Sequence, residues 1–328
     1  MRSWLINIKT DQTNPVTKQL MNTKKIISGF QKLSESLFFS NYFYGICAVG
    51  LSVEACLQQR IRINSFSYFV MVFFITVLYY SYPYIRKTLV QTNNPRTNWY
   101  TRYYDMMRWN QIIITIILAV LFFMFCVQFG KPLLNTAAAH WPLIFVFPVV
   151  ACLYYGANFL CKKYSLRKIG WLKPFVIGFA WAGLVTVYPA FFYNITNRVG
   201  YQFSWVGTLL FTKNFMFISV LCIMFDIKDY TVDYVARLKT FVVNLGLHRT
   251  IFYIVLPLSA AGLASFVLYA ATHQFNPVKL LLNVIPFLLL IAVAWSLRKR
   301  RSLLYYLCIV DGLMLAKAVF GCLAMKYF

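Results

Sequence analysis

Three aspartates stand close together in a chain that has few acidic residues. The sequence has eight Asp and Glu residues against 32 Lys and Arg residues, and Asp226, Asp229 and Asp233 are three of the eight. At 100° per residue, a helix through this segment would place the three carboxylates within an arc of about 60°. Carboxylates this close repel one another unless water or a cation intervenes. Because carboxylate oxygens suit Mg²⁺, which also takes waters and phosphate oxygens, the spacing predicts a metal–diphosphate site.

The same aspartates also have a purely structural interpretation. Asp226 and Asp229 would favour the N-terminus of a helix, and Asp233 would pair with Arg237 four residues later. Composition and spacing alone leave both interpretations open.

The composition indicates the environment in which these acids lie. The chain has 328 residues, of which 60% are hydrophobic and 12% are charged, whereas a soluble domain has roughly twice that share of charge. A soluble or disordered protein is therefore excluded. A nucleic-acid-binding protein would gather its basic charge on a water-exposed face, but here long apolar stretches separate the charges. We expect a lipid bilayer, and no nucleic acid, as the partner of the basic residues.

Apolar stretches long enough to cross a bilayer, about 20 residues each, occur nine times. We expect spans at Leu37–Leu57, Phe66–Ile85, Ile112–Phe129, Trp141–Phe159, Trp171–Tyr193, Phe203–Phe225, Ile251–Thr272, Val278–Leu297 and Leu303–Met325. The predicted fold is therefore an all-α, polytopic membrane protein with a single transmembrane domain over residues 37–328. We expect a basic, interfacial arm over residues 1–36.

The basic residues outside the spans alternate between the two sides of the predicted bundle. One side receives 24 Lys and Arg residues and the other receives six. By the positive-inside rule, the N-terminus is cytoplasmic and the C-terminus is outside. We therefore predict a multi-pass protein of the cell (inner) membrane.

The longer string around the aspartates resembles a known family. Asp226, Asp229 and Asp233 form a D-x-x-D-x-x-x-D run, and a basic, Thr-containing stretch follows from Arg237 to Leu245-Gly246. This string is similar to the second aspartate-rich motif of the UbiA superfamily of intramembrane prenyltransferases. The segments 153–163 and 172–181, the nine expected spans and the cytoplasmic position of the motif agree with the same family.

The resemblance implies an activity and a set of ligands. Members of the family bind an isoprenoid diphosphate through Mg²⁺, ionise it to an allylic cation and transfer the prenyl chain to an aromatic or other hydrophobic acceptor. By resemblance, Asp226, Asp229 and Asp233 would be the metal ligands. The cationic side chains that would bind the diphosphate are Arg86, Lys87, Lys162, Lys163 and Arg237.

One part of the family pattern is missing. The first aspartate-rich motif should lie at the inner end of the second span, near Tyr79–Arg86, but no acid occurs between Glu54 and Asp105. Arg86 and Lys87 stand there instead. Fixed cations can hold a diphosphate without a metal, although the same two residues also suit an ordinary positive-inside flank.

Aromatic and ionisable residues give two further expectations. The rings of Tyr79, Tyr82, Tyr84 and Tyr230 are candidates to line a prenyl pocket, where ring faces stabilise a cation; an interfacial aromatic belt would also explain most aromatic residues of this kind. Ionisable residues inside spans are usually paired or functional. Lys213 and Asp311 are therefore the candidates for an intramembrane pair, with structural neutralisation as the expected role.

Two functions remain open at this point. The first is a UbiA-like prenyltransferase that uses Mg²⁺. The second is a catalytically inactive or altered relative that binds an isoprenoid or quinone-type lipid or scaffolds a membrane partner, which the missing motif favours. A transporter is a third class, but the sequence lacks a two-fold repeat and paired Gly/Pro-broken helices.

Overall fold

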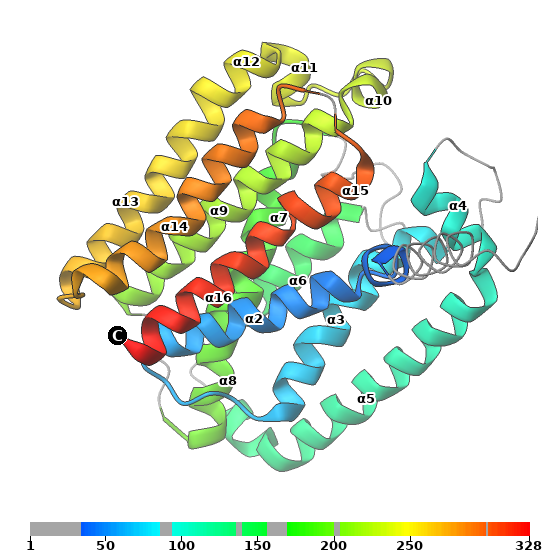
Figure 1. The fold of residues 1–328 in the computed structure, drawn as a ribbon. Coiled ribbons are helices and arrows are strands. Elements are labelled where there is room, and N and C mark those ends of the chain that lie inside the picture. The colour runs from blue at the N-terminus through cyan, green and yellow to red at the C-terminus, as the bar shows by residue number, and fades with distance from the viewer. Residues whose placement is uncertain (1–33, 86–93, 136–139, 156–168, 200–203, 300) are drawn as a thin grey trace, which may run out of the picture.

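The computed structural model describes residues 34–85, 94–135, 140–155, 169–199, 204–299 and 301–328. The described part of the chain is all-helical and contains no strand (Figure 1). The predicted all-α class is therefore confirmed. Four predicted diphosphate ligands, Arg86, Lys87, Lys162 and Lys163, lie outside the described residues.

Seven helical segments of the described chain are long and apolar enough to cross a membrane. They are Phe66–Ile85 (α3), Tyr104–Leu134 (α5), Lys173–Asn197 (α7, η3 and α8), Trp205–Lys228 (α9), Leu247–Thr272 (α12, η4 and α13), Pro277–Ser296 (α14) and Leu303–Tyr327 (α15, η5 and α16). Each corresponds to a predicted span. The other two predicted spans correspond to the shorter apolar helices α2 (Tyr42–Gln58) and α6 (Trp141–Tyr155). These helices indicate a multi-pass membrane protein. The nine crossings and the cytoplasmic location of the N-terminus remain predictions.

The starts of several helices are set by local side-chain caps. Ser204 accepts a hydrogen bond from the backbone of Gly207 at the start of α9, and Asn276 accepts one from the backbone of Lys279 at the start of α14. Such caps satisfy backbone N–H groups that have no partner within the helix.

Three of the long segments contain a π-helical turn. The turns are η3 (Gly183–Val187), η4 (Ile251–Val255) and η5 (Tyr306–Val310), and each separates two α-helical parts. Those parts are α7 (Lys173–Ala182) and α8 (Tyr188–Asn197), α12 (Leu247–Thr250) and α13 (Leu256–Thr272), and α15 (Leu303–Tyr305) and α16 (Gly312–Tyr327). Pro189 and Pro257 lie at the start of the α-helices that follow η3 and η4, consistent with the missing proline N–H. The third turn ends immediately before Asp311.

The helices pack around α9. This helix contacts α7 on one side and α13 on the other, while α2 packs against α3 and α16 (Figure 1). Close approach depends on small residues: a Cβ atom at Gly178 of α7 would lie 2.2 Å from the Ser219 Oγ of α9. Helix α5 lies at the edge of the bundle, and most of its apolar side chains are exposed, as a lipid-facing helix requires (Figure 1).

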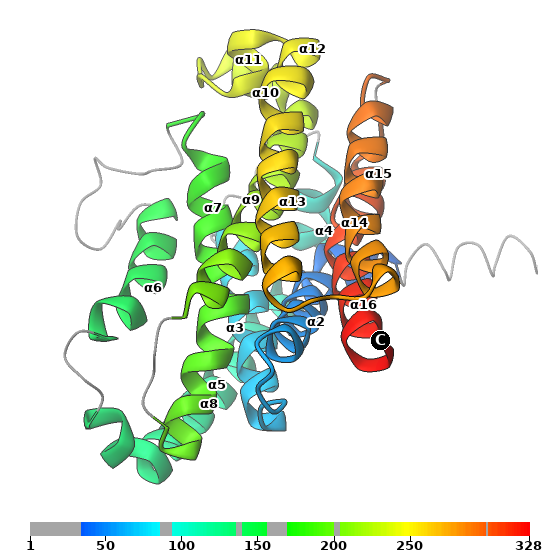
Figure 2. The same cartoon turned by 90° about the vertical axis from the view of Figure 1, so that its left-hand side faces the viewer.

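Short helices gather at one end of the bundle, which we call the α10 end. They are α10 (Tyr230–Val235), α11 (Phe241–Leu245) and α12, while α4 (Pro95–Arg102) packs against α3 and α5 (Figures 1 and 2). The connection between α2 and α3, the end of α8 and the C-terminus lie toward the opposite end (Figures 1 and 2).

A buried ionic network joins three helices away from the α10 end. Glu54 of α2 is 1% exposed, and its Oε1 atom lies 2.9 Å from the Nζ of Lys213 of α9. Its Oε2 atom lies 2.7 Å from the Nζ of Lys317 of α16. The expected pairing of Lys213 with Asp311 is therefore wrong, because Lys213 has Glu54 as its partner and Asp311 accepts a hydrogen bond from Tyr44.

Amide side chains complete this network. Gln58 accepts a hydrogen bond from Lys213 (2.7 Å) and donates to Glu54 (2.9 Å) and to Asn283 of α14 (3.1 Å). A fourth helix is thereby connected to the other three. Buried charges are tolerated when they are both paired and hydrogen-bonded, and the Glu54 carboxylate meets both conditions.

The packing of Gly321 against Glu54 can be tested by substitution. A Cβ atom at Gly321 of α16 would lie 2.6 Å from the Glu54 side chain, whereas one at Gly312, the first residue of α16, would meet nothing within 4 Å. We expect Gly321→Ala to lower the free energy of unfolding by about 1–3 kcal/mol through overpacking. Gly312→Ala, the matched control, should leave it nearly unchanged. Thermal unfolding of the detergent-purified variants measures both, and equal stability of the two would contradict the described register of α2 and α16.

Candidate functional site

A cavity of about 240 Å³ lies among the helices at the α10 end. We call it the aromatic cavity. Its lining combines aromatic, apolar and charged side chains from α2, α3, α4, α6, α7, α9, α15, η5 and α16, and from residues that flank them. The residues that line it are Tyr44, Tyr80, Pro83, Tyr84, Asn94, Arg96, Tyr154, Lys173, Ile177, Trp181, Ile218, Leu221, Cys222, Phe225, Lys228, Asp229, Leu303, Leu307, Asp311 and Met314.

Stacked aromatic rings form part of the wall. The rings of Tyr44 and Tyr80 stack with centroids 4.6 Å apart, and the indole nitrogen of Trp181 donates a hydrogen bond of 2.6 Å to the Tyr80 hydroxyl. These contacts fix three rings from α2, α3 and α7 against one another. The wall therefore offers ring faces and apolar side chains to a bound hydrocarbon chain.

Asp226 lies next to this cavity and is engaged in an ion pair. Its carboxylate is 1% exposed, and Oδ1 lies 2.5 Å from the Nζ of Lys173, which is 19% exposed. The other carboxylate oxygen, Oδ2, is buried without a hydrogen-bond partner. Lys173 begins α7 and Asp226 lies in the last turn of α9, so the pair joins these two helices at the edge of the cavity.

The three aspartates do not share one helix, contrary to the arc predicted above. Helix α9 ends at Lys228, and Asp229 forms the junction between α9 and α10. Asp229 is 38% exposed, lines the cavity and pairs with Lys228. Asp233 lies on α10 and is buried. Within the described ranges, no group of three or more His, Cys, Asp or Glu side chains is arranged to hold a metal ion.

Most of the other predicted site residues lie outside the aromatic cavity. Arg237 follows the end of α10 with φ of 53° and is exposed, so it shares no helix face with Asp233. The Tyr79 hydroxyl donates to the carbonyl of Ala151 over 3.0 Å. Tyr82 is 49% exposed and Tyr230 is 41% exposed. Of the four tyrosines named from the sequence, Tyr84 is the one that lines the cavity.

The structure adds a buried tyrosine–carboxyl contact that the sequence did not reveal. The Tyr44 hydroxyl donates a hydrogen bond of 2.6 Å to Oδ2 of Asp311, and both residues line the cavity. Asp311 was visible in the sequence as an acid within a span. Tyr44 gave no signal, because its partner lies 267 residues away.

Arg96 is the second residue that sequence reasoning missed. It belongs to α4, lines the cavity and is 7% exposed. In the sequence it resembles the other basic residues of a positive-inside loop. The available signal was Asn94-Pro95. An N-cap residue followed by a proline predicts that a helix begins here, with Arg96 in its first turn.

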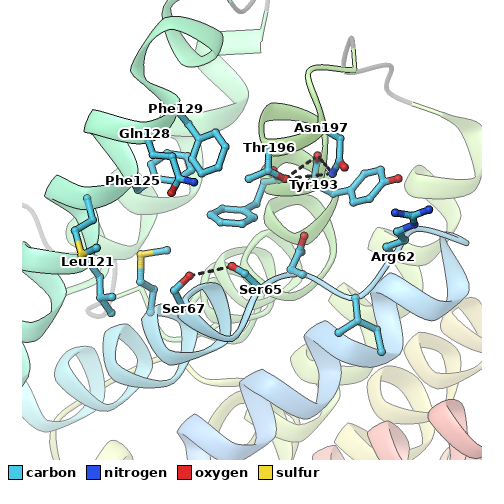
Figure 3. Close-up of a pocket in the computed structure, with 15 residues that line it drawn as sticks. Arg62, Ser65, Ser67, Leu121, Phe125, Gln128, Phe129, Tyr193, Thr196 and Asn197 are labelled. Carbon is cyan, nitrogen blue, oxygen red and sulfur yellow. Dashed lines mark hydrogen bonds between the residues drawn. The ribbon is translucent and has the colours of Figure 1, made fainter.

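A larger cavity of about 340 Å³ lies toward the opposite end, between the start of α3, the second half of α5 and the end of α8 (Figure 3). Its polar side chains largely contact one another or nearby backbone: Ser65 and Ser67 share a hydrogen bond of 2.9 Å, and Asn197 donates to the Tyr193 carbonyl over 2.8 Å (Figure 3). Arg62 is the one charged residue of its lining. The aromatic cavity carries more charge and is the stronger candidate for an anionic ligand.

Comparison with known proteins adds no relative. None of the family models, curated proteins or solved structures compared with the chain matches it. The function is therefore argued from the cavity itself.

The Lys173–Asp226 pair provides a test of the geometry at the cavity edge. We expect Lys173→Met to lower the free energy of unfolding by about 3–5 kcal/mol, because it leaves the buried Asp226 charge without its partner. Adding Asp226→Asn should recover much of that loss, since the uncompensated charge is then removed. Thermal unfolding of the wild type, both single variants and the double variant completes the cycle. Additive effects of the two substitutions would contradict the pairing.

Proposed function

We propose that the aromatic cavity binds an isoprenoid diphosphate and that the protein is a UbiA-like prenyltransferase. The observation that carries this proposal is the composition of one cavity: aromatic and apolar walls, the cations Arg96, Lys173 and Lys228, and the half-exposed carboxylate of Asp229. A prenyl diphosphate has matching parts, a hydrocarbon chain and a polyanionic head group. The acceptor would be an aromatic or lipid molecule.

The charged side chains support the head-group part of the proposal. Lys173 and Lys228 begin α7 and end α9, so both lie at the edges of membrane-crossing helices, where a diphosphate reaches them from the interface. Ammonium groups bind phosphate oxygens strongly in a partly desolvated site. Exposure of Asp229 leaves it accessible to a cation that arrives with the diphosphate.

The chemistry of the donors fits a magnesium ion held by two carboxylates better than one held by three. Mg²⁺ typically uses one or two carboxylates together with waters and substrate phosphates. Asp229 faces the cavity, and the unpartnered Oδ2 of Asp226 belongs to the neighbouring turn of α9. The carboxylates of Asp226 and Asp229 would hold the ion, and Asp233 follows them on α10. When bound, the ion would neutralise charge on the leaving diphosphate.

The aromatic walls support the hydrocarbon part of the proposal. Ring faces of Tyr44, Tyr80 and Trp181 attract a positively charged carbon centre, and the surrounding apolar helices exclude water that would otherwise capture it. The Tyr44 hydroxyl is occupied by Asp311. That contact keeps the Tyr44 ring in place beside Tyr80.

A second candidate is the non-catalytic binding of an isoprenoid or quinone-type lipid, or the scaffolding of a membrane partner. The observation that favours it is that the carboxylates of Asp226 and Asp229 already have lysine partners. A cavity whose acids are neutralised by the protein can hold a phosphate through its cations alone. The two candidates therefore differ in whether the metal adds to binding.

Binding of geranylgeranyl diphosphate to detergent-purified protein, measured with Mg²⁺ and with EDTA, separates the candidates. For the transferase we expect Mg²⁺ to strengthen binding by about tenfold or more, equivalent to at least 1.4 kcal/mol. The double variant Asp226→Asn/Asp229→Asn should lose this strengthening, because it lacks the metal ligands. The control Asp105→Asn, which changes an exposed acid at the start of α5, should retain it.

Two other outcomes would exclude one or both of the candidate functions. Binding that is indifferent to both the metal and the double substitution would exclude the transferase and support the non-catalytic lipid-binding protein. A wild-type protein that does not bind the diphosphate under either condition would contradict both candidates.

A further inference from the structure

Arg96 is a buried cation that forms no direct ion pair with a carboxylate in the described part of the protein. Its side chain is 7% exposed and lines the aromatic cavity. The Nε atom is buried and has no hydrogen-bond partner. A guanidinium group stays charged in proteins and carries five N–H donors. Burying such a charge without an anion is costly.

The local fold holds Arg96 in this position. Asn94 caps α4 by accepting a hydrogen bond of 3.0 Å from the backbone N–H of Arg96. One terminal nitrogen of the guanidinium donates to Oδ1 of Asn41, and the guanidinium carbon lies 4.8 Å from the centroid of the Tyr84 ring. Asn41 and Tyr84 are both neutral, so they orient the cation without compensating its charge.

The partner that orients Arg96 is itself fixed by other neutral groups. Asn41 is completely buried and donates through Nδ2 to the Ser81 hydroxyl at 2.9 Å and to the Tyr100 hydroxyl at 3.0 Å. Burial raises the pKa of the Tyr100 phenol, which lies on α4 outside the membrane-crossing helices. Tyr100 therefore remains neutral at physiological pH. This arrangement pre-organises the guanidinium at the cavity wall.

The carboxylates near the cavity have other partners. Every Asp and Glu of the chain except Asp11 lies in the described residues, and none of them forms an ion pair with Arg96. Asp226 pairs with Lys173 and Asp229 pairs with Lys228. Asp311 accepts the hydrogen bond from Tyr44. Of the three cations that line the aromatic cavity, Arg96 is thus the one without a carboxylate at ion-pair distance, and Asp311 attracts it only from farther away.

We propose that Arg96 binds a phosphate group of the isoprenoid diphosphate directly, without a metal ion between them. This inference rests on the proposed function and extends it to the side chain that selects a phosphorylated ligand. The planar guanidinium presents paired N–H donors that match two phosphate oxygens. An anion at Arg96 would satisfy the unpartnered Nε and place a counter-charge in direct contact with the guanidinium. The neutral alcohol with the same prenyl chain has no phosphate oxygens and no negative charge, so Arg96 distinguishes the diphosphate from the alcohol.

The test compares Arg96→Gln with Arg102→Gln, a matched substitution of an exposed arginine on the same helix. Three probes are measured, in Mg²⁺ and in EDTA: geranylgeranyl diphosphate, inorganic pyrophosphate and geranylgeraniol. Arg96→Gln should weaken binding of geranylgeranyl diphosphate about 10- to 100-fold in both conditions, because charge-assisted hydrogen bonds are lost. It should also weaken binding of pyrophosphate. It should leave geranylgeraniol binding unchanged, and Arg102→Gln should resemble the wild type for all three.

Folding is controlled separately, because Arg96 also contacts Asn41. Tyr100→Phe removes another contact of α4 with Asn41 but keeps the guanidinium, so it should weaken binding of the diphosphate less than Arg96→Gln does. If Arg96→Gln does not yield folded protein, Arg96→Lys serves in its place. It keeps the charge but loses the paired donors, so a several-fold weaker affinity for the diphosphate is expected.

The outcomes separate this inference from the proposed function. Binding of geranylgeranyl diphosphate by the wild type, with the same affinity in folded Arg96→Gln or in Arg96→Lys, would overturn the role of Arg96 while leaving the proposed function in place. Equal weakening of geranylgeraniol and the diphosphate would also overturn it, because the residue would then act on the shape of the cavity rather than on phosphate. A wild-type protein that binds neither form of the prenyl chain would overturn the proposed function itself.

Discussion

An ionised side chain among apolar helices must find its partners within the protein, because the surrounding lipid supplies none. Glu54 meets this constraint by contacting Lys213 and Lys317, and the arrangement of α2, α9 and α16 follows from it. These helices also carry residues of the aromatic cavity nearer the α10 end, among them Tyr44 of α2 and Lys228 of α9, and Asp311 lies immediately before α16. A helix rises by a fixed distance per residue, so holding the helices together at Glu54 sets the height at which each cavity residue lies.

The same network contains two lysines and one carboxylate, and both lysines have further contacts besides Glu54. The ammonium group of Lys213 donates to Glu54 and to Gln58, and it lies 5.5 Å from the centroid of the Phe266 ring. Lys317 lies 5.7 Å from the centroid of the Phe217 ring. Ring faces attract cations and do so more strongly where water is excluded. The buried lysines are thereby held by a combination of one carboxylate, one amide and two aromatic rings.

Helix positions could be predicted from the sequence because they depend on local composition, whereas pairings across the bundle could not. Apolar length indicated the positions of the long helices, and Lys213 was correctly marked as needing a partner. Its partner could not be identified, since Glu54 is separated from it by 159 residues and no periodicity connects the two. The prediction that the three aspartates share one helix face was wrong for a different reason. Constant helical rotation was assumed from Asp226 to Asp233, but α9 ends at Lys228 and the chain turns at Asp229. One motif therefore supplies an ion-paired buried acid, a half-exposed acid at the cavity and a buried acid on α10.

A fixed cation and a metal ion neutralise a phosphate by different means, and the difference bears on the missing acidic motif. A metal ion requires several oxygen ligands, so a site built on two metal-binding motifs depends on acids from both halves. An arginine brings its charge on its own side chain and needs only neutral groups to orient it, as Asn41 and Tyr84 orient Arg96. The stretch between Glu54 and Asp105 contains no acid and does contain Arg96. A guanidinium has the opposite charge to a carboxylate, yet it would meet the same electrostatic requirement, because the proposed phosphate ligand is negative. The absence of acids from this stretch is therefore compatible with the proposed binding of a prenyl diphosphate.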